Sequence, residues 1–163
     1  MISVLKKLCK EVRSFPFVEG ENKTKYAFLS IYLFRNKLIE MPKTENFYIY
    51  AVLDGSIRLH TPSGIMDYLP GQYSISKIDI PASGHVLTFS EKDDFLALSI
   101  EITLNDVISV LLDLDGNIAE KIANDQLDAK MMSSSDNKVF LSILRLFSMN
   151  KDPMPLGFMG NHI

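Results

Sequence analysis

The sequence has only one cysteine, Cys9, among its 163 residues. A single thiol excludes an internal disulfide and leaves no set of thiolates to hold a metal ion. Cys9 shares one helical face with Leu5, Leu8 and Val12. We therefore expect it to pack as a small apolar side chain.

Long apolar runs are also missing. A membrane-spanning helix needs about eighteen apolar residues in a row, and the longest run here is FYIYAVL, residues 47–53. The opening segment, MISVLKKLCKEV, has no apolar stretch long enough for a secretory signal. These absences predict a cytoplasmic protein with no membrane partner.

The sequence has no excess of positive charge either. The net charge of −3 is made up of +3 over residues 1–25, −3 over residues 26–102 and −3 over residues 103–163. A surface that binds DNA needs a row of lysine and arginine side chains to neutralise phosphates. We therefore expect that this stretch of polypeptide does not itself bind DNA.

Motifs of the common catalytic and metal sites are absent. The three histidines, His60, His85 and His162, are widely spaced, and no His-x-His pair occurs. A first-row metal site needs about three converging ligands, which His60, His85 and a carboxylate such as Glu101 would have to supply. There is no G-x-S-x-G motif and no glycine-rich phosphate loop. We expect no metal ion, no cofactor and no enzymatic activity.

The sequence does contain a series of short strand patterns. They are YAFLSIYLF (26–34), FYIYAVL (47–53), SIRLH (56–60), IMDYL (65–69), HVLTFS (85–90) and FLALSIEI (95–102). The first is apolar on both alternating faces, which is typical of a strand covered on two sides. Asp54-Gly55 predicts a tight hairpin turn, and residues 61–64 predict a second turn. Many short strands with frequent turns indicate an antiparallel β-barrel or jelly roll.

Structure-breaking residues concentrate in YLPGQYSISKIDIPASGHV, residues 68–86. Pro70-Gly71 fits the centre of a type II turn, because proline fixes φ and glycine accepts a positive φ. The apolar alternation slips by one residue near Ser76-Lys77, which predicts a bulge. Pro81 predicts an edge or a corner, because proline donates no ladder hydrogen bond. We expect these residues to fold the sheet into a closed barrel with an interior for a small molecule.

Helical patterns flank the strands. Residues 4–13 are amphipathic, and Thr103-Leu104-Asn105-Asp106 has the form of a capping box ahead of VISVLLDL. A further helix is predicted over residues 136–147. The fold class is therefore α+β, as a single domain: an N-terminal helix and loop (1–25), a cupin-like β-barrel (26–102) and a helical segment (103–163).

The last predicted helix also carries a candidate subunit interface. Its apolar residues recur at three- and four-residue steps over a wide arc. Any part of this arc that the barrel leaves uncovered would favour an isologous homodimer. The interface candidates are Val139, Phe140, Ile143, Leu144 and Phe147.

The stretch PGQYSIS-x-IDIP-x-SGHV resembles the N-terminal domain of a subgroup of AraC-type transcriptional regulators. The likeness extends over residues 26–150, through Tyr32-Leu33-Phe34-Arg35, Val52-Leu53-Asp54-Gly55-Ser56, Gly64, Tyr68 and Phe95-Leu96-Ala97-Leu98. The resemblance implies a cupin-like barrel that senses a small-molecule effector or mediates dimerisation. In such regulators a pair of helix-turn-helix units follows in the same chain and binds DNA. No such half is present here, so we expect the chain to be the regulatory part of a longer protein.

The predicted barrel wall offers candidate ligand-binding residues. They are Arg35, Tyr48, Tyr50, Arg58, His60, Tyr68 and Tyr73. The alternative interpretation is that the aromatic residues are plain core, and that Ile57 and Leu59 face inwards while Arg58 and His60 face water. Two other functions stay open: a stand-alone small cupin that is a metal-dependent enzyme, and a ligand-free interaction module.

Overall fold

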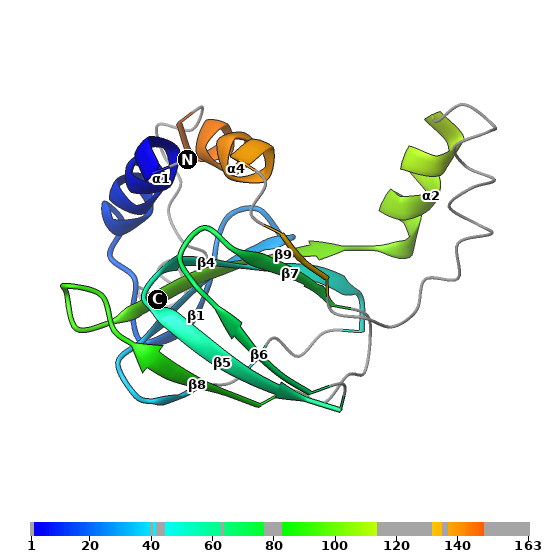
Figure 1. The fold of residues 1–163 in the computed structure, drawn as a ribbon. Helices are drawn as coiled ribbons and strands as arrows, with labels where there is room; N and C mark the ends of the chain where they lie inside the picture. The colour runs from blue at the N-terminus through cyan, green and yellow to red at the C-terminus, as the bar shows by residue number, and fades with distance from the viewer. Residues whose placement is uncertain are drawn as a thin grey trace, which may run out of the picture.

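The computed structural model shows two stacked antiparallel β-sheets with helices on the outer face of one of them (Figure 1). It describes residues 2–39, 41, 45–62, 64–76, 83–113, 132–134 and 137–148. Sheet A has the order β1 (Gly20–Lys23), β2 (Leu29–Phe34), β9 (Phe95–Ile102), β4 (Phe47–Asp54), β7 (Tyr73–Ser76) and β10 (Met132–Ser134). Sheet B has the order β3 (Leu38–Ile39), β8 (Ser83–Thr88), β5 (Ser56–Thr61) and β6 (Gly64–Tyr68).

The predicted α+β class with an antiparallel β architecture is confirmed, but one feature of the prediction is wrong. The strands hydrogen-bond within two separate sheets and not around one closed barrel. Three short strands, β1, β3 and β10, were also not predicted from the sequence. The first lies in the predicted N-terminal loop and the last in the predicted helical segment.

Alternation along the strands of sheet A creates two cores. In β4, Tyr48, Tyr50 and Val52 point between the sheets, whereas Ala51 and Leu53 point towards the helices. Every residue of β2 is buried, as expected for a strand covered on both faces. The doubly covered strand predicted within residues 26–34 is therefore confirmed from Leu29 to Phe34, whereas residues 26–28 form a turn ahead of it.

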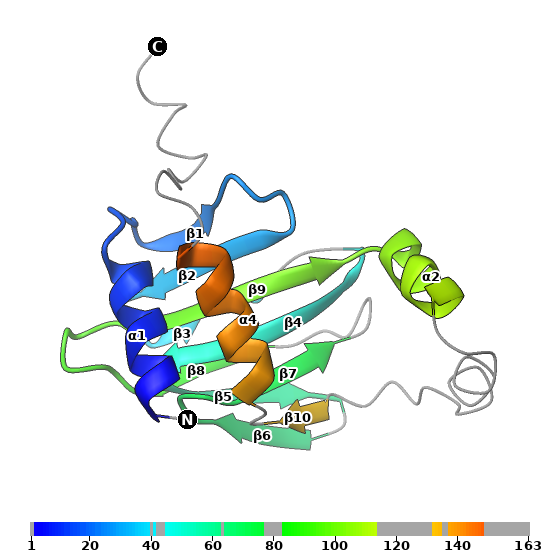
Figure 2. The same cartoon turned by 90° about the horizontal axis from the view of Figure 1, so that it is seen from above.

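Two helices cover the outer face of sheet A. Figure 2 shows α1 (Ile2–Arg13) and α4 (Asn137–Ser148) side by side across the strands. Leu8 and Val12 of α1 and Phe140 and Ile143 of α4 are buried there against the sheet. None of the helices in the described ranges is both long and apolar enough to cross a bilayer.

This packing corrects part of the predicted dimer interface. Phe140 is fully buried and Ile143 is 3% exposed within the chain itself. Leu144 is half-buried against the same core. These side chains therefore stabilise the monomer, while the side chains of Val139 and Phe147 lie outside the described part of the structure.

Asp54-Gly55 does not form the predicted hairpin. The strands on either side of it, β4 and β5, belong to different sheets, so the pair is a corner between the two layers. Gly55 has φ +80°, and a Cβ placed there would lie 2.8 Å from the carbonyl oxygen of Thr88. A glycine is needed at this corner both for the backbone angle and for the close approach.

Two other local predictions are confirmed. The backbone N–H of Gln72 donates to the carbonyl of Leu69 at 3.0 Å, and Gly71 has φ +86°, as a type II turn requires. Thr103 and Asp106 form the reciprocal capping bonds that begin α2 (Leu104–Asp113), at 2.8 and 3.1 Å. The bulge predicted at Ser76-Lys77 and the corner predicted at Pro81 extend outside the described residues.

Candidate functional site

A row of hydroxyl groups crosses the inner face of sheet A. Strand register places Ser74 of β7 opposite Tyr50 of β4, Tyr50 opposite Ser99 of β9, and Ser99 opposite Ser30 of β2. All four residues are buried, with exposures from 1% to 6%. We call these residues the hydroxyl row. Polar groups in such a position, between two sheets, are the groups that orient a ligand in an otherwise apolar site.

Two members of the hydroxyl row lack partners. Tyr50 Oη and Ser74 Oγ are buried and form no hydrogen bond with any described residue. Tyr68 of sheet B lies near enough to Ser74 for a hydrogen-bonding interaction with the serine to lower the pKa of Tyr68 against the larger effect of burial. The Tyr68 hydroxyl is directed at Met66 Sδ, to which it donates at 3.6 Å, so Ser74 Oγ is left without a hydrogen bond of good geometry. A buried hydroxyl without a partner costs about 1–3 kcal/mol. At this end of the inter-sheet space, the described residues therefore leave two buried hydroxyls without hydrogen bonds.

A connected network lies beside the row. Ser99 Oγ donates to Tyr32 Oη at 3.3 Å, and Tyr32 Oη donates to Glu21 Oε1 at 3.0 Å. On the other side, Glu101 lies opposite Tyr48 and accepts a hydrogen bond from Asn46 Nδ2 at 2.5 Å. Two carboxylates thus flank the hydroxyls.

The protonation of these groups follows from their surroundings. Burial raises the pKa of Tyr32, Tyr50 and Tyr68, so all three hydroxyls stay neutral at physiological pH. Partial burial works to raise the pKa of Glu21, but hydrogen bonds, first of all from Lys23, bring that pKa below its ordinary value. The site therefore offers neutral hydroxyls beside a carboxylate that is ionised.

The structure divides the predicted ligand-binding residues among four locations. Tyr48, Tyr50 and Tyr68 lie together between the sheets. Tyr73 points to the opposite face of sheet A and packs against Phe140, with ring centroids 6.2 Å apart. It belongs to the helix-facing core, which corrects its predicted place in the barrel interior.

The remaining candidates lie outside the inter-sheet space. Arg58 and His60 are on the outer face of sheet B, because Ile57 and Leu59 fill its inner face. Arg58 pairs with Asp67 through two hydrogen bonds of 2.6 and 2.7 Å. Arg35 follows β2 with an exposed side chain. These three residues do not contact the hydroxyl row, and the water-facing alternative holds for Arg58 and His60.

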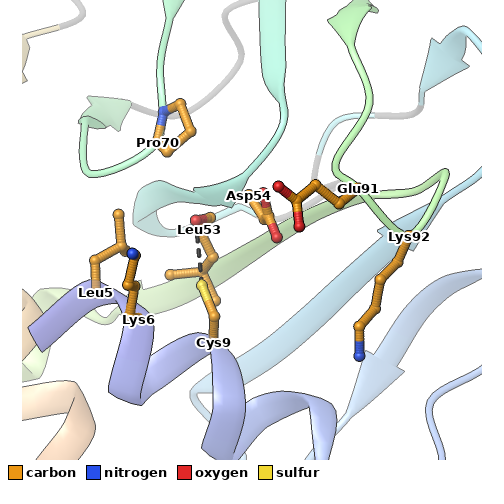
Figure 3. Close-up of a pocket in the computed structure, with 8 residues that line it drawn as sticks. All are labelled: Leu5, Lys6, Cys9, Leu53, Asp54, Pro70, Glu91 and Lys92. Atoms are coloured by element: carbon orange, nitrogen blue, oxygen red, sulfur yellow. Dashed lines mark hydrogen bonds between the residues drawn. The ribbon is translucent and has the colours of Figure 1, made fainter. Parts of the chain in front are cut away.

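A hollow lies elsewhere, between α1 and the loops at one end of the sheets (Figure 3). Its volume is about 530 Å³, and it is lined by Leu5, Lys6, Cys9, Leu53, Asp54, Pro70, Glu91 and Lys92. The Cys9 thiol donates to the Leu53 carbonyl at 3.2 Å, and burial raises the pKa of this thiol to about 11. A protonated, hydrogen-bonded thiol is not a nucleophile, so the packing role predicted for Cys9 fits this geometry.

An ion-pair cluster adjoins this hollow through Asp54, which belongs to both. Arg13 of α1 donates two hydrogen bonds to Asp94, at 2.7 and 2.8 Å, and one to Asp54 at 3.0 Å. Ser90 Oγ also donates to Asp94, at 2.7 Å. Burial opposes the ionisation of Asp94, but the hydrogen bonds from Arg13 and Ser90 lower its pKa. The cluster joins the N-terminal helix to the loop between β8 and β9.

Comparison with known families agrees with this architecture. The family model described as AraC-type transcriptional regulator N-terminus matches residues 27–163. The chain belongs to this AraC-type family.

Solved structures similar to this AraC-type domain include ToxT from Vibrio cholerae, with a TM-score of 0.55 and 9% identity over 80% of the domain and 51% of ToxT. The unsaturated fatty acid bound wild-type ToxT from Vibrio cholerae strain SCE256 has a TM-score of 0.52 and 12% identity over 83% of the domain and 49% of ToxT. At such identities the likeness shows a shared fold. The AraC-type domain spans about half the length of these ToxT chains. A comparison with curated proteins gave no match.

Sequence reasoning missed several residues of the site in the AraC-type domain. Ser30, Ser74 and Ser99 carry hydroxyls that face the same space as Tyr50, yet a serine in a strand is a weak signal. The period-two pattern does place each of them on the inner face of its own strand. The pattern does not predict the order of the strands in the sheet, and it is this order that brings the three serines into one row.

Proposed function

We propose that this AraC-type domain senses a small effector molecule that binds between its two sheets, at the hydroxyl row. The observation that carries the proposal is the pair of buried hydroxyls, Tyr50 Oη and Ser74 Oγ, which have no hydrogen-bond partner among the described residues. The two residues lie directly opposite each other on β4 and β7. A ligand that offers them hydrogen bonds would remove the cost of leaving them unpaired.

The charges around the row favour an uncharged or cationic ligand. Glu21 and Glu101 flank the hydroxyls, and Glu21 has a pKa below its ordinary value. A carboxylate brought beside them would be repelled. ToxT structures are described as bound to an unsaturated fatty acid and to (E)-4-(8-methylnaphthalen-1-yl)but-3-enoic acid. We expect this domain to bind its effector between the two sheets and to prefer a neutral molecule with several hydroxyl or amide groups.

The same proposal defines the role of the domain. An effector changes a regulator only if it binds one of two arrangements more tightly than the other. We therefore propose a regulatory and not a catalytic role, in the cytoplasm. The net charge of −3 gives no support for direct DNA contacts by this chain, so we assign DNA binding to the helix-turn-helix unit of a full-length regulator.

The experiment is a ligand screen by thermal shift, with neutral monosaccharides, polyols and amides in one set and fatty acids in another. A ligand of the neutral set should raise the melting temperature of the domain. Tyr50→Phe and Ser74→Ala should abolish that shift. Tyr73→Phe is the matched control, because it removes a hydroxyl on the opposite face of the same sheet.

A fatty acid that raises the melting temperature while the neutral set has no effect would contradict the proposed ligand chemistry. A shift that survives both Tyr50→Phe and Ser74→Ala would contradict the proposed location. The two outcomes are distinct, so each part of the proposal is tested separately.

Self-association is a second candidate role, and α2 is the surface that favours it. In Figures 1 and 2 this helix extends away from the two sheets. Leu104 is 62% exposed and Ile108 is 44% exposed, and their four-residue spacing puts them on one face of the helix. We propose that two copies of the domain associate through this face of α2, in place of the buried face of α4.

Sedimentation velocity tests this interface. Leu104→Lys with Ile108→Lys should shift the domain, or the full-length regulator, from dimer towards monomer. Val18→Lys is the matched control, because Val18 is 60% exposed but lies in the loop before β1. A dimer of unchanged stability in the α2 variant would rule out this face.

A further inference from the structure

The outer face of sheet B holds two histidines side by side. His60 of β5 and His85 of β8 are 25 residues apart in the sequence, but their strands are neighbours in the sheet. Nε2 of His60 lies 3.3 Å from Nδ1 of His85. The ring centroids are 5.2 Å apart and the ring planes differ by 28°.

This separation matches the geometry of a chelating pair. Two imidazole nitrogens that bind one tetrahedral Zn²⁺, each at about 2.05 Å, are held about 3.3 Å apart. The nitrogens of His60 and His85 therefore already have the spacing of two ligands of one ion. The same contact is a hydrogen bond between the two rings, so an ion would replace its shared proton after a rotation of the rings. His60 is exposed and His85 is half-buried, which leaves the pair open to an ion from solvent.

The surrounding charges suit a cation. Asp67 of β6 is close enough to both histidines that they contribute to lowering its pKa, after the larger effect of its hydrogen bonds from Arg58. Those bonds neutralise the positive charge of Arg58, the nearest cationic side chain across the strand register. Within the described part of the chain no third histidine, cysteine or carboxylate completes a metal-binding group. Water would therefore fill the remaining coordination positions, as the exposure of the pair permits.

We propose that His60 and His85 bind a divalent transition-metal ion of the class that prefers imidazole, Zn²⁺ or Cu²⁺. The ion joins β5 to β8 on the outer face of sheet B. The neighbours of these histidines along the same strands, Leu59 and Val86, point into the inter-sheet core. The site is separate from the hydroxyl row on sheet A, so the inference does not depend on the proposed effector.

Isothermal titration of the untagged protein with ZnCl₂ tests the proposal. We expect one ion per chain. Loss of a supporting residue around a bound metal commonly weakens binding 10–100-fold, so loss of a direct ligand in His60→Gln or His85→Gln should weaken it by at least about tenfold. His162→Gln is the control and should keep the affinity, since it removes the remaining histidine of the chain. Arg58→Gln should not weaken binding, because it leaves the Asp67 carboxylate unpaired near the two histidines.

NMR of the histidine rings gives an independent measurement. Substoichiometric Cu²⁺ should broaden the ring signals of His60 and His85 before that of His162. The proposal is overturned if the His60→Gln/His85→Gln double variant binds Zn²⁺ as tightly as the parent protein, if the parent protein does not bind Zn²⁺, or if only the His162 signal broadens. Circular dichroism of each variant establishes that a loss of binding is not a loss of folding.

Discussion

Arg13 and Asp94 form a two-bond ion pair that holds the N-terminal helix against the sheets. The nitrogens of Arg13 lie 2.7 and 2.8 Å from the two carboxylate oxygens of Asp94, and the Asp94 side chain is only 6% exposed. A second carboxylate, Asp54, accepts from the same guanidinium at 3.0 Å. The ion pair thus joins α1 to the loop between β8 and β9, about eighty residues later in the sequence.

Arg13→Met should lower the free energy of unfolding by about 3 kcal/mol, because it leaves a buried carboxylate without its cation. Urea denaturation measures the change. Arg58→Met is the matched control, since the Arg58–Asp67 pair is exposed to water and such pairs contribute little. Equal, small effects in both variants would show that the Arg13 pair does not stabilise the fold.

The Arg13–Asp94 pair should make the free energy of unfolding depend on pH in the acid range. The pKa of Asp94 is lower in the folded protein than its ordinary value, so its contribution is complete above about pH 4 and is lost as pH falls through the folded pKa. Urea denaturation between pH 7 and pH 3 should show a fall in stability at the acid end. Asp94→Asn should be less stable at pH 7 and show a smaller fall. An identical pH profile in the variant would contradict this assignment.

Removal of the Tyr50 hydroxyl should leave the unliganded domain as stable as before or slightly more stable. The hydroxyl is buried without a hydrogen bond in the described structure, so Tyr50→Phe removes a cost. Tyr32→Phe is the control, because the Tyr32 hydroxyl forms hydrogen bonds with Ser99 and Glu21 and its loss should cost about 1 kcal/mol. Thermal and urea unfolding compare the two. A loss in Tyr50→Phe as large as that in Tyr32→Phe would show that Tyr50 already has a partner.

Gly55→Ala should destabilise the domain by at least about 2 kcal/mol, because the new methyl group meets the Thr88 carbonyl at 2.8 Å and the backbone φ is +80°. Gly20→Ala is the control, since φ at Gly20 is also positive but the space around it is open. Only the backbone strain is common to both variants. A smaller loss at Gly55 than at Gly20 would contradict the close approach at the corner.

Predictions from the sequence were most accurate for features that depend on residues close together in the chain. The capping box at Thr103 and Asp106, the Pro70-Gly71 turn and the doubly apolar pattern of β2 each depend on a few neighbouring residues. The hairpin predicted at Asp54-Gly55 was wrong because hairpin turns and sheet-to-sheet corners need the same positive φ. The close approach of Thr88, 33 residues after Gly55, decides between them.

The candidate sites could be predicted only in part. Tyr50 is a predicted ligand contact, but its neighbours Ser74 and Ser99 come from strands whose order is set by long-range pairing. His60 and His85 approach each other for the same reason. The strand β1, with the polar sequence GENK, has no apolar alternation and is defined by its pairing with β2.

The junction between β9 and α2 consists of one residue, Thr103, whose hydrogen bonds with Asp106 fix the start of the helix. No flexible linker is present there to absorb a rotation of the strand end. A change of about 10° in the direction of β9 would displace the far end of this helix, about 15 Å away, by about 2.6 Å. Because Ser99 and Glu101 lie on that strand, a small adjustment around a bound molecule would be amplified into a reorientation of the projecting helix.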